Sequence, residues 1–172
     1  MKPIRFCYSF QWNTVVMRCL LVFILILTTQ AQADPYDEKA DARQDIAAAL
    51  KAAQRSGKFV LLDFGANWCP DCRVLSAQMQ GDPLKTLVDK NFIVVMVDIG
   101  EGEKNADLVS KYGNVTERGI PSIVIVNGSN AILVRTLTGQ LANARHMGGR
   151  ELYDFFTGVV DRAQQASAAG VR

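Results

Sequence analysis

Two cysteines separated by two residues constrain this chain more than any other feature. They are Cys69 and Cys72, in the sequence WCPDC at 68–72. An apolar run at 59–64 precedes them, and a helix-like stretch continues to Met79. Such a pair near a βαβ pattern is typical of a redox motif, because the two thiols can close a small disulfide or remain a dithiol. Cys69 is then expected just outside a helix N-terminus, where the helix dipole favours its thiolate.

The first 33 residues have the pattern of a secretory signal peptide. They contain three basic residues and no acid, then an apolar run at 19–27 and the sequence AQA at 31–33. This order of basic, apolar and small residues predicts cleavage after Ala33, and therefore a periplasmic or secreted protein. The alternative is a membrane anchor through residues 15–29, although the apolar run is shorter than the roughly 20 residues that span a bilayer.

Removal of this leader changes both the charge and the cysteine count. The formal net charge is +2, but residues 34–172 hold 16 basic and 17 acidic residues. They lack the basic surface expected of a nucleic-acid-binding protein. Cys7 and Cys19 leave with the leader, so that Cys69 and Cys72 remain in a compartment where disulfides persist. A bridge that closes so short a loop stabilises a fold weakly, which favours chemistry over a structural role.

Apolar periodicity and chain breakers predict alternating helices and strands after a polar lead-in at 34–41. Helices are expected at 38–55, 72–79 and 106–112 and from 149, and strands at 59–64, 92–97, 122–126 and 131–137. The runs at 59–64 and 92–97 lack polar alternation, which is typical of strands buried on both faces. Joined by a helix, they predict a right-handed βαβ unit. Residues 164–172 are expected to form a frayed tail.

This order of elements resembles the thioredoxin-like family. Four further features carry the resemblance. Asp63 is an acid in the strand six residues before the first cysteine, and Trp68 directly precedes that cysteine. Gly119-Ile120-Pro121 resembles the family's cis-proline loop, and Gly139 follows the last strand, where the family has a glycine. The resemblance covers about residues 38–162. It implies an α/β thioredoxin fold, with a central mixed sheet flanked by helices, for a domain at 34–172 that follows the signal peptide at 1–33.

Within the family, the segment from Gly57 to Cys69 resembles the C-terminal domain of the periplasmic thiol:disulfide interchange protein, an exported bacterial protein. The resemblance implies a thiol-disulfide oxidoreductase in which Cys69 attacks a substrate disulfide and Cys72 resolves the mixed disulfide. Thioredoxin itself has Gly-Pro between its cysteines, whereas this chain has Pro-Asp. That departure bears on the partner rather than on the chemistry.

Asp63 is the candidate proton carrier of this chemistry. A carboxyl group in an apolar strand is costly to bury unless it is paired or protonated. The functional interpretation is a carboxyl group with a raised pKa that exchanges a proton with Cys72. The alternative is an ion pair at the strand end with Lys58 or Lys90.

Five residues are expected to contact the substrate: Trp68, Pro70, Ile120, Pro121 and Gly139. A cis Ile120-Pro121 bond would turn backbone groups of Ile120 outward, where they can pair with an extended peptide. The alternative for Pro121 is the start of an edge strand, where prolines are tolerated. The alternative for Trp68 is a place in the core.

The expected partners are protein disulfides and an upstream thiol electron donor, with a membrane-bound donor among the candidates. No organic cofactor is expected, and no metal, because zinc needs about four ligands and the mature chain adds only His146 to its two cysteines. We expect a monomer.

Asp71 bears on the direction of electron flow. Its negative charge next to Cys69 disfavours the thiolate, which favours a reductase over an oxidase. The alternatives are a disulfide oxidase or isomerase, or a non-catalytic binding or assembly factor on the same scaffold.

Overall fold

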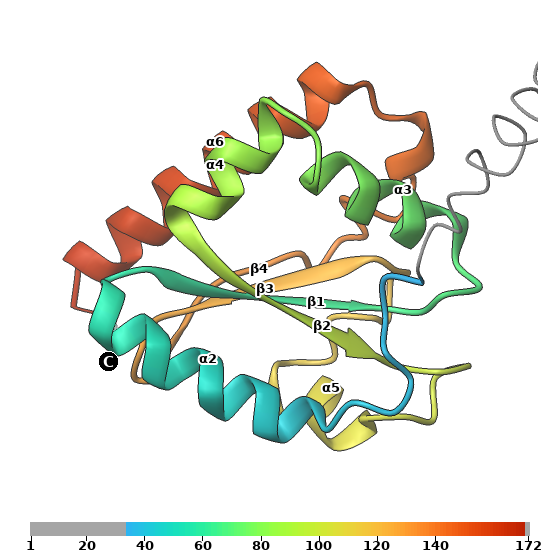
Figure 1. Cartoon of the computed structure of the whole chain (residues 1–172), viewed down its shortest axis with the longest axis horizontal. Helices are drawn as coiled ribbons and strands as arrows, with labels where there is room; N and C mark the ends of the chain where they lie inside the picture. The colour runs from blue at the N-terminus through green and yellow to red at the C-terminus, as the bar shows by residue number, and fades with distance from the viewer. Residues whose placement is uncertain (1–33, 171–172) are drawn as a thin grey trace, which may run out of the picture. The chain divides into compact units, whose positions relative to one another are not determined.

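The computed structural model describes residues 34–170; the predicted signal peptide and the predicted anchor lie outside the described residues. A four-stranded sheet of order β2-β1-β3-β4 forms the centre (Figure 1). β1 (Phe59–Gly65) pairs in parallel with β2 (Phe92–Asp98) and antiparallel with β3 (Ser122–Val126), and β3 pairs antiparallel with β4 (Ile132–Arg135). The predicted mixed sheet is confirmed.

Helices cover both faces of this sheet (Figure 1). One face packs against α2 (Ala42–Ser56) and α5 (Ala106–Lys111). The other packs against α3 (Pro70–Met79), α4 (Leu84–Asn91) and α6 (Gly149–Ala168), with the short 3-10 helix η1 (Ala144–His146) beside α3. Alternate residues of β1 enter the two cores, because successive side chains of a strand point to opposite faces.

The two apolar strands of the predicted βαβ unit differ in burial. β1 lies between β2 and β3 and is buried from Val60 onward. β2 is an edge strand of the described sheet, and Val94 is 36% exposed. The prediction of burial on both faces is therefore correct for β1 and wrong for β2. An apolar run without polar alternation does not distinguish a central strand from an edge strand that one helix partly covers.

The C-terminal end of α2 agrees with the sequence prediction, whereas that of α6 does not. Asp41 caps α2, since its carboxylate accepts hydrogen bonds from the amides of Arg43 and Gln44, and Gly57 ends it at φ 72°. Gly57 was the predicted stop. α6, in contrast, continues to Ala168, so the predicted frayed tail from 164 is wrong. Ala163 is fully buried, whereas residues 164–168 are exposed or partly exposed, so α6 continues for about one turn beyond its last buried residue.

Within residues 34–170, no helix combines the length and the apolar character that crossing a membrane requires.

Candidate active site

Both cysteines lie where β1 turns into α3. Cys69 is the N-cap of α3, and its Sγ accepts a hydrogen bond from the backbone amide of Cys72 at 3.2 Å. Pro70 occupies the first turn, where a missing amide hydrogen costs nothing. Both thiols are free and nearly inaccessible, Cys72 entirely so. The predicted position of Cys69 just outside the helix N-terminus is confirmed.

The environment separates the acidities of the two thiols. Hydrogen bonds from the side chain and the backbone of Cys72 lower the pKa of Cys69 to about 7, against the effects of burial and of the Asp71 charge. The same side-chain hydrogen bond, together with burial, raises the pKa of Cys72 well above its ordinary value. Near neutral pH, Cys69 is therefore partly ionised, whereas Cys72 stays protonated.

Asp71 acts on Cys69 in the predicted direction, but other groups outweigh it. Its carboxyl group is largely buried, and Oδ1 accepts a hydrogen bond from the backbone amide of Arg145 at 2.9 Å. The Arg145 guanidinium lies 3.8 Å from Oδ2. Asp71 thus joins α3 to η1 while its charge opposes ionisation of Cys69.

Asp63 lies fully buried in β1, between Met96 of β2 and Ile123 of β3. Neither carboxyl oxygen makes a hydrogen bond of regular geometry within residues 34–170. Burial is the main cause that raises the pKa of Asp63 to about 7, and the charge of Cys69 adds to the rise. The alternative of a lysine partner is not realised: Lys58, for example, donates to the backbone carbonyl of Asp89 at 2.5 Å.

The loop before β3 closes the site opposite Cys69. The Ile120-Pro121 bond is cis, as predicted, and the Cys69 thiol donates to the carbonyl of Ile120 at 3.6 Å. Pro121 leads into β3, which lies between β1 and β4, so the alternative of an edge strand is wrong. Gly139, at φ 69°, packs beside this loop: a Cβ there would lie 2.5 Å from the carbonyl oxygen of Arg118.

The remaining candidate residues form a rim around Cys69. Trp68 is 54% exposed, and its Nε1 donates to the carbonyl of Gly100 at 2.8 Å, so it is not part of the core. Pro70 is exposed and Ile120 is partly exposed. Contact of these residues with a substrate stays a prediction.

Tyr36 is a site residue that the sequence analysis missed. It belongs to the segment interpreted as a polar lead-in, yet it is 1% exposed and packs with Cys69 and Cys72. Met96 and Ile120, both partly buried, pack against the same cluster. The available signal was one aromatic residue among charged neighbours, and that pattern alone does not indicate what the side chain contacts.

No group of three or more His, Cys, Asp or Glu side chains in residues 34–170 is arranged to hold a metal ion. The arrangement instead offers an ionisable thiol at a helix end, a second thiol beneath it and a buried acid nearby. Those are the parts needed for thiol-disulfide exchange.

Comparisons with known proteins agree with this arrangement. A family model described as thioredoxin-like matches residues 41–128. The crystal structure of a disulphide isomerase from Xylella fastidiosa Temecula1 is 42% identical, covers 75% of this chain and 98% of that one, and superposes with a TM-score of 0.73. The oxidised C-terminal domain of DsbD from Neisseria meningitidis is 21% identical, covers 69% of this chain and 96% of that one, and has a TM-score of 0.51, which shows a shared fold.

Two curated relatives match over shorter stretches. A thioredoxin from Buchnera aphidicola subsp. Baizongia pistaciae is 34% identical over 98 residues, or 57% of this chain and 81% of the relative. Probable nucleoredoxin 3 from Oryza sativa subsp. japonica is 33% identical over 89 residues, or 46% of this chain. The match spans only 19% of that much longer protein.

Proposed function

The chain belongs to the thioredoxin-like family and is a thiol-disulfide oxidoreductase, and from this premise we propose that it is exported and reduces disulfides of other proteins. The observation that carries the proposal is the Cys69 thiol at the N-terminus of α3, with its pKa lowered to about 7 and Cys72 directly behind it. A thiolate is the nucleophile in disulfide exchange, and near neutral pH this site supplies one.

The proposed cycle uses the two cysteines in turn. The Cys69 thiolate attacks one sulfur of a substrate disulfide, and the other substrate sulfur leaves with the electron pair and takes up a proton. Cys72 then loses its proton to Asp63 and attacks Sγ of Cys69. A Cys69–Cys72 disulfide forms, the bond to the substrate breaks, and the substrate leaves fully reduced. A thiol electron donor, soluble or membrane-bound, reduces the chain again.

The acidity of Cys69 supports the reducing direction. Among proteins of this fold, the reducing thioredoxin has a nucleophile pKa near 7, whereas the strongest periplasmic oxidant has one near 3.5. A lower pKa stabilises the thiolate of the reduced form and makes the disulfide a stronger oxidant. A pKa of about 7 for Cys69 therefore supports the proposed reducing direction.

Disulfide isomerisation is the second candidate, because the 42% identical structure is described as a disulphide isomerase. An isomerase starts with the same attack by Cys69. It differs in that another substrate thiol, rather than Cys72, resolves the mixed disulfide. The two candidates therefore make opposite predictions for a chain that lacks Cys72.

Reduction of insulin by the mature chain, with a small dithiol as electron donor, tests the proposal. Cys69→Ser is expected to abolish turnover because the nucleophile is gone. Cys72→Ser is expected to abolish turnover as well, but to accumulate a mixed disulfide on Cys69 that can be seen by mass spectrometry. Turnover that survives Cys69→Ser would contradict the assigned nucleophile.

The same two variants separate reductase from isomerase when scrambled ribonuclease replaces insulin. Recovery of ribonuclease activity with Cys72→Ser would favour the isomerase. Recovery of ribonuclease activity that requires both cysteines would favour the reductase. A wild-type chain that reduces insulin but recovers no ribonuclease activity would favour it as well. A wild-type chain inactive in both assays would favour a binding or assembly factor.

A further inference from the structure

A short strap carries Tyr36 into the active site. We use the name strap for residues 34–41, the segment before α2 (Figure 1). Its residues on either side of Tyr36 are exposed or partly exposed, whereas Tyr36 is 1% exposed. A segment that buries one side chain and leaves its neighbours in water is expected to serve the placement of that side chain.

Gly65 provides the space in which the Tyr36 hydroxyl meets the resolving thiol. A Cβ at Gly65 would lie 2.2 Å from the Tyr36 hydroxyl oxygen and 2.9 Å from Sγ of Cys72. Both atoms therefore border the same small volume. Asp63 precedes Gly65 by two residues in β1, so both face the same side of the strand. The carboxyl group, the hydroxyl and the resolving thiol meet on that side.

The Tyr36 hydroxyl and the two carboxyl oxygens of Asp63 make no hydrogen bond of regular geometry within residues 34–170, although the hydroxyl lies close enough to interact with both Asp63 and Cys72. Buried polar groups are nearly always hydrogen-bonded, and an unpaired one is costly. A buried hydroxyl that lies near two ionisable groups, without a hydrogen bond of regular geometry to either, indicates a donor with two alternative acceptors.

Two hydrogen bonds hold the backbone of the strap at Tyr36 itself. The Tyr36 amide donates to Oδ1 of Asn67 at 3.0 Å, and Nδ2 of Asn67 donates to the Tyr36 carbonyl at 2.8 Å. Asn67 stands two residues before Cys69, so the strap is tied directly to the redox turn.

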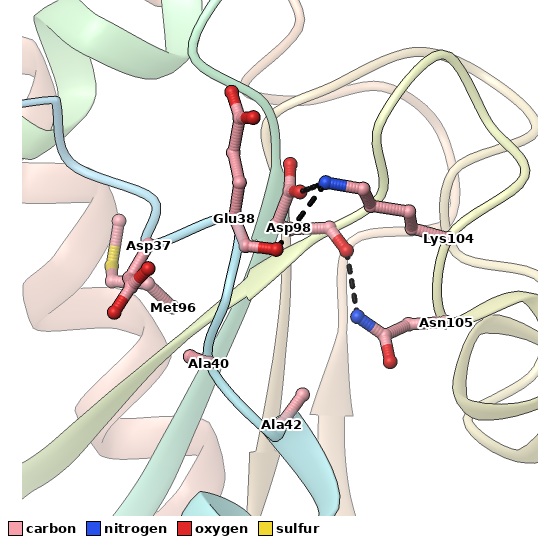
Figure 2. Close-up of a pocket in the computed structure, with 8 residues that line it drawn as sticks. All are labelled: Asp37, Glu38, Ala40, Ala42, Met96, Asp98, Lys104 and Asn105. Atoms are coloured by element: carbon pink, nitrogen blue, oxygen red, sulfur yellow. Dashed lines mark hydrogen bonds and ion pairs between the residues drawn. The ribbon is translucent and has the colours of Figure 1, made fainter.

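Farther along the strap, a hydrogen bond from Lys104 makes a second contact that holds the strap in place. Figure 2 shows the Lys104 ammonium group between the Glu38 carbonyl, at 3.4 Å, and the Asp98 carboxylate, at 2.8 Å. These residues line a pocket of about 190 Å³ that Met96 also borders. The contacts limit how far the strap can shift along β2, and with it the hydroxyl of Tyr36.

We propose that the Tyr36 hydroxyl is a hydrogen-bond donor that switches from Asp63 to Cys72 during resolution of the mixed disulfide, an inference that rests on the proposed Cys69/Cys72 cycle. Before resolution the hydroxyl donates to the ionised carboxylate of Asp63. When the Cys72 proton moves to Asp63, the negative charge moves to sulfur and the hydroxyl turns to donate to the Cys72 thiolate.

The switch requires no change in the protonation of Tyr36. Burial, together with the nearby Asp63 and Cys72, raises the pKa of its hydroxyl far above neutrality, so that it remains a donor throughout. The Cys72 thiolate attacks Sγ of Cys69, the new disulfide forms, and the electron pair leaves on the substrate sulfur. That sulfur takes a proton from water, and Asp63 returns its own proton to water afterwards.

Stopped-flow reaction of the reduced chain with dithiobis(nitrobenzoate) tests this switch. Attack by Cys69 releases a first equivalent of the coloured thiol at a rate proportional to reagent. Attack by Cys72 on the mixed disulfide releases a second equivalent at a rate that does not depend on reagent. The first phase therefore reports the nucleophile, and the second reports resolution.

Tyr36→Phe keeps the buried ring and removes only the hydroxyl. It is expected to slow the second phase about tenfold near neutral pH, because a hydrogen bond to a charged group is lost, and to leave the first phase within about twofold. The pH midpoint of the second phase should move upward, since the Tyr36 hydroxyl lowers the pKa of Asp63.

Tyr112→Phe is the matched control. Tyr112 is equally buried, but its hydroxyl donates to Asn130 at 2.9 Å, away from the cysteines. This variant should lose stability and keep both phases and their pH midpoints. Of these two variants, only Tyr36→Phe is therefore expected to change the second phase and its pH midpoint.

An unchanged second phase and pH midpoint in folded Tyr36→Phe would overturn the proposal. If that variant does not fold, Asn67→Ala replaces it, because loss of the two bonds that seat Tyr36 should slow the second phase in the same way; an unchanged second phase there would overturn the proposal too. A wild-type chain with a first but no second phase would instead contradict the Cys69/Cys72 cycle itself.

Discussion

Asp63 is ionised at a cost that the Tyr36 hydroxyl offsets only in part, because burial raises the pKa of the carboxyl group more than this hydroxyl lowers it. Its pKa of about 7 means that the folded chain binds a proton between about pH 4 and pH 7 that the unfolded chain releases. Stability must therefore fall as pH rises through this window, since the unfolded state binds fewer protons than the folded one. A base that titrates near neutrality is also well matched to accept a proton from a thiol.

Asp63→Asn is expected to affect stability and rate in opposite directions. The shift from 3.8 to about 7 corresponds to about 4 kcal/mol of stability lost by the wild type between pH 4 and pH 8. The variant should lack this loss, so that its unfolding free energy relative to wild type rises by about that amount. Urea unfolding of both proteins across this pH range measures it.

In the same variant the rate of resolution should fall about tenfold to a hundredfold near pH 7, because the proton acceptor is missing. The wild-type rate should rise with pH and level off above about 7, whereas the variant should not show this rise. Attack by Cys69 on the reagent is the internal control and should change little. A variant that resolves at the wild-type rate would remove Asp63 from the mechanism.

At the scale of elements, the N-terminus of α3 is tuned by a contact with η1. Asp71 lies in the first turn of α3, where a negative charge favours the helix, but it also opposes the Cys69 thiolate. Arg145 supplies both an amide and a guanidinium to this carboxylate. Because of this contact, we expect the placement of η1 to influence how strongly Asp71 acts on Cys69.

Asp71→Asn and Arg145→Ala should shift the pKa of Cys69 in opposite directions. Removing the Asp71 charge should lower it by about half a unit to one unit, because that carboxylate is buried and poorly screened. Removing the guanidinium should raise it slightly, since Arg145 is about half exposed and its charge is screened by water. Ultraviolet absorbance of the thiolate during a pH titration measures both shifts.

The reduction potential should follow these pKa values. Asp71→Asn stabilises the thiolate of the reduced form, so it should make the disulfide more oxidising in equilibrium with glutathione. Arg145→Ala should have a weaker effect of opposite sign. If both variants shifted the pKa the same way, the change would come from movement of η1 rather than from charge.

For the whole molecule, local patterns predicted the elements and their order well. Hydrophobic runs and the glycine at position 57 placed β1 and the end of α2, and the cysteine spacing with Asp63 and Trp68 identified the family. The same patterns failed where long-range packing decides. They could not show that β2 lies at the edge of the sheet, that Ala163 near the end of α6 is fully buried, or that a polar segment carries Tyr36 to the cysteines.

The site shows the same division. The cysteine pair, the buried acid and the cis proline follow from residue types at fixed spacings. The pKa of Cys69, in contrast, depends on how Cys72, Asp71 and burial add together, and the sequence predicted only the signs of the helix-dipole and Asp71 contributions. Tyr36 lies 33 residues before Cys69, and nothing in that separation predicts a contact.

The position of the predicted cleavage site determines whether the mature chain keeps the strap. The predicted cleavage after Ala33 leaves the exposed Asp34 as the first residue, two positions before Tyr36. A cut there retains the complete strap, whereas a cut after residue 36 would remove the hydroxyl from the active site. In a bacterial host we therefore expect periplasmic protein whose mass begins at Asp34, with both phases of the thiol assay intact. Full-length protein recovered from the membrane fraction would instead favour the anchor at 15–29, and a mature chain that begins beyond Tyr36 would contradict a role for the strap.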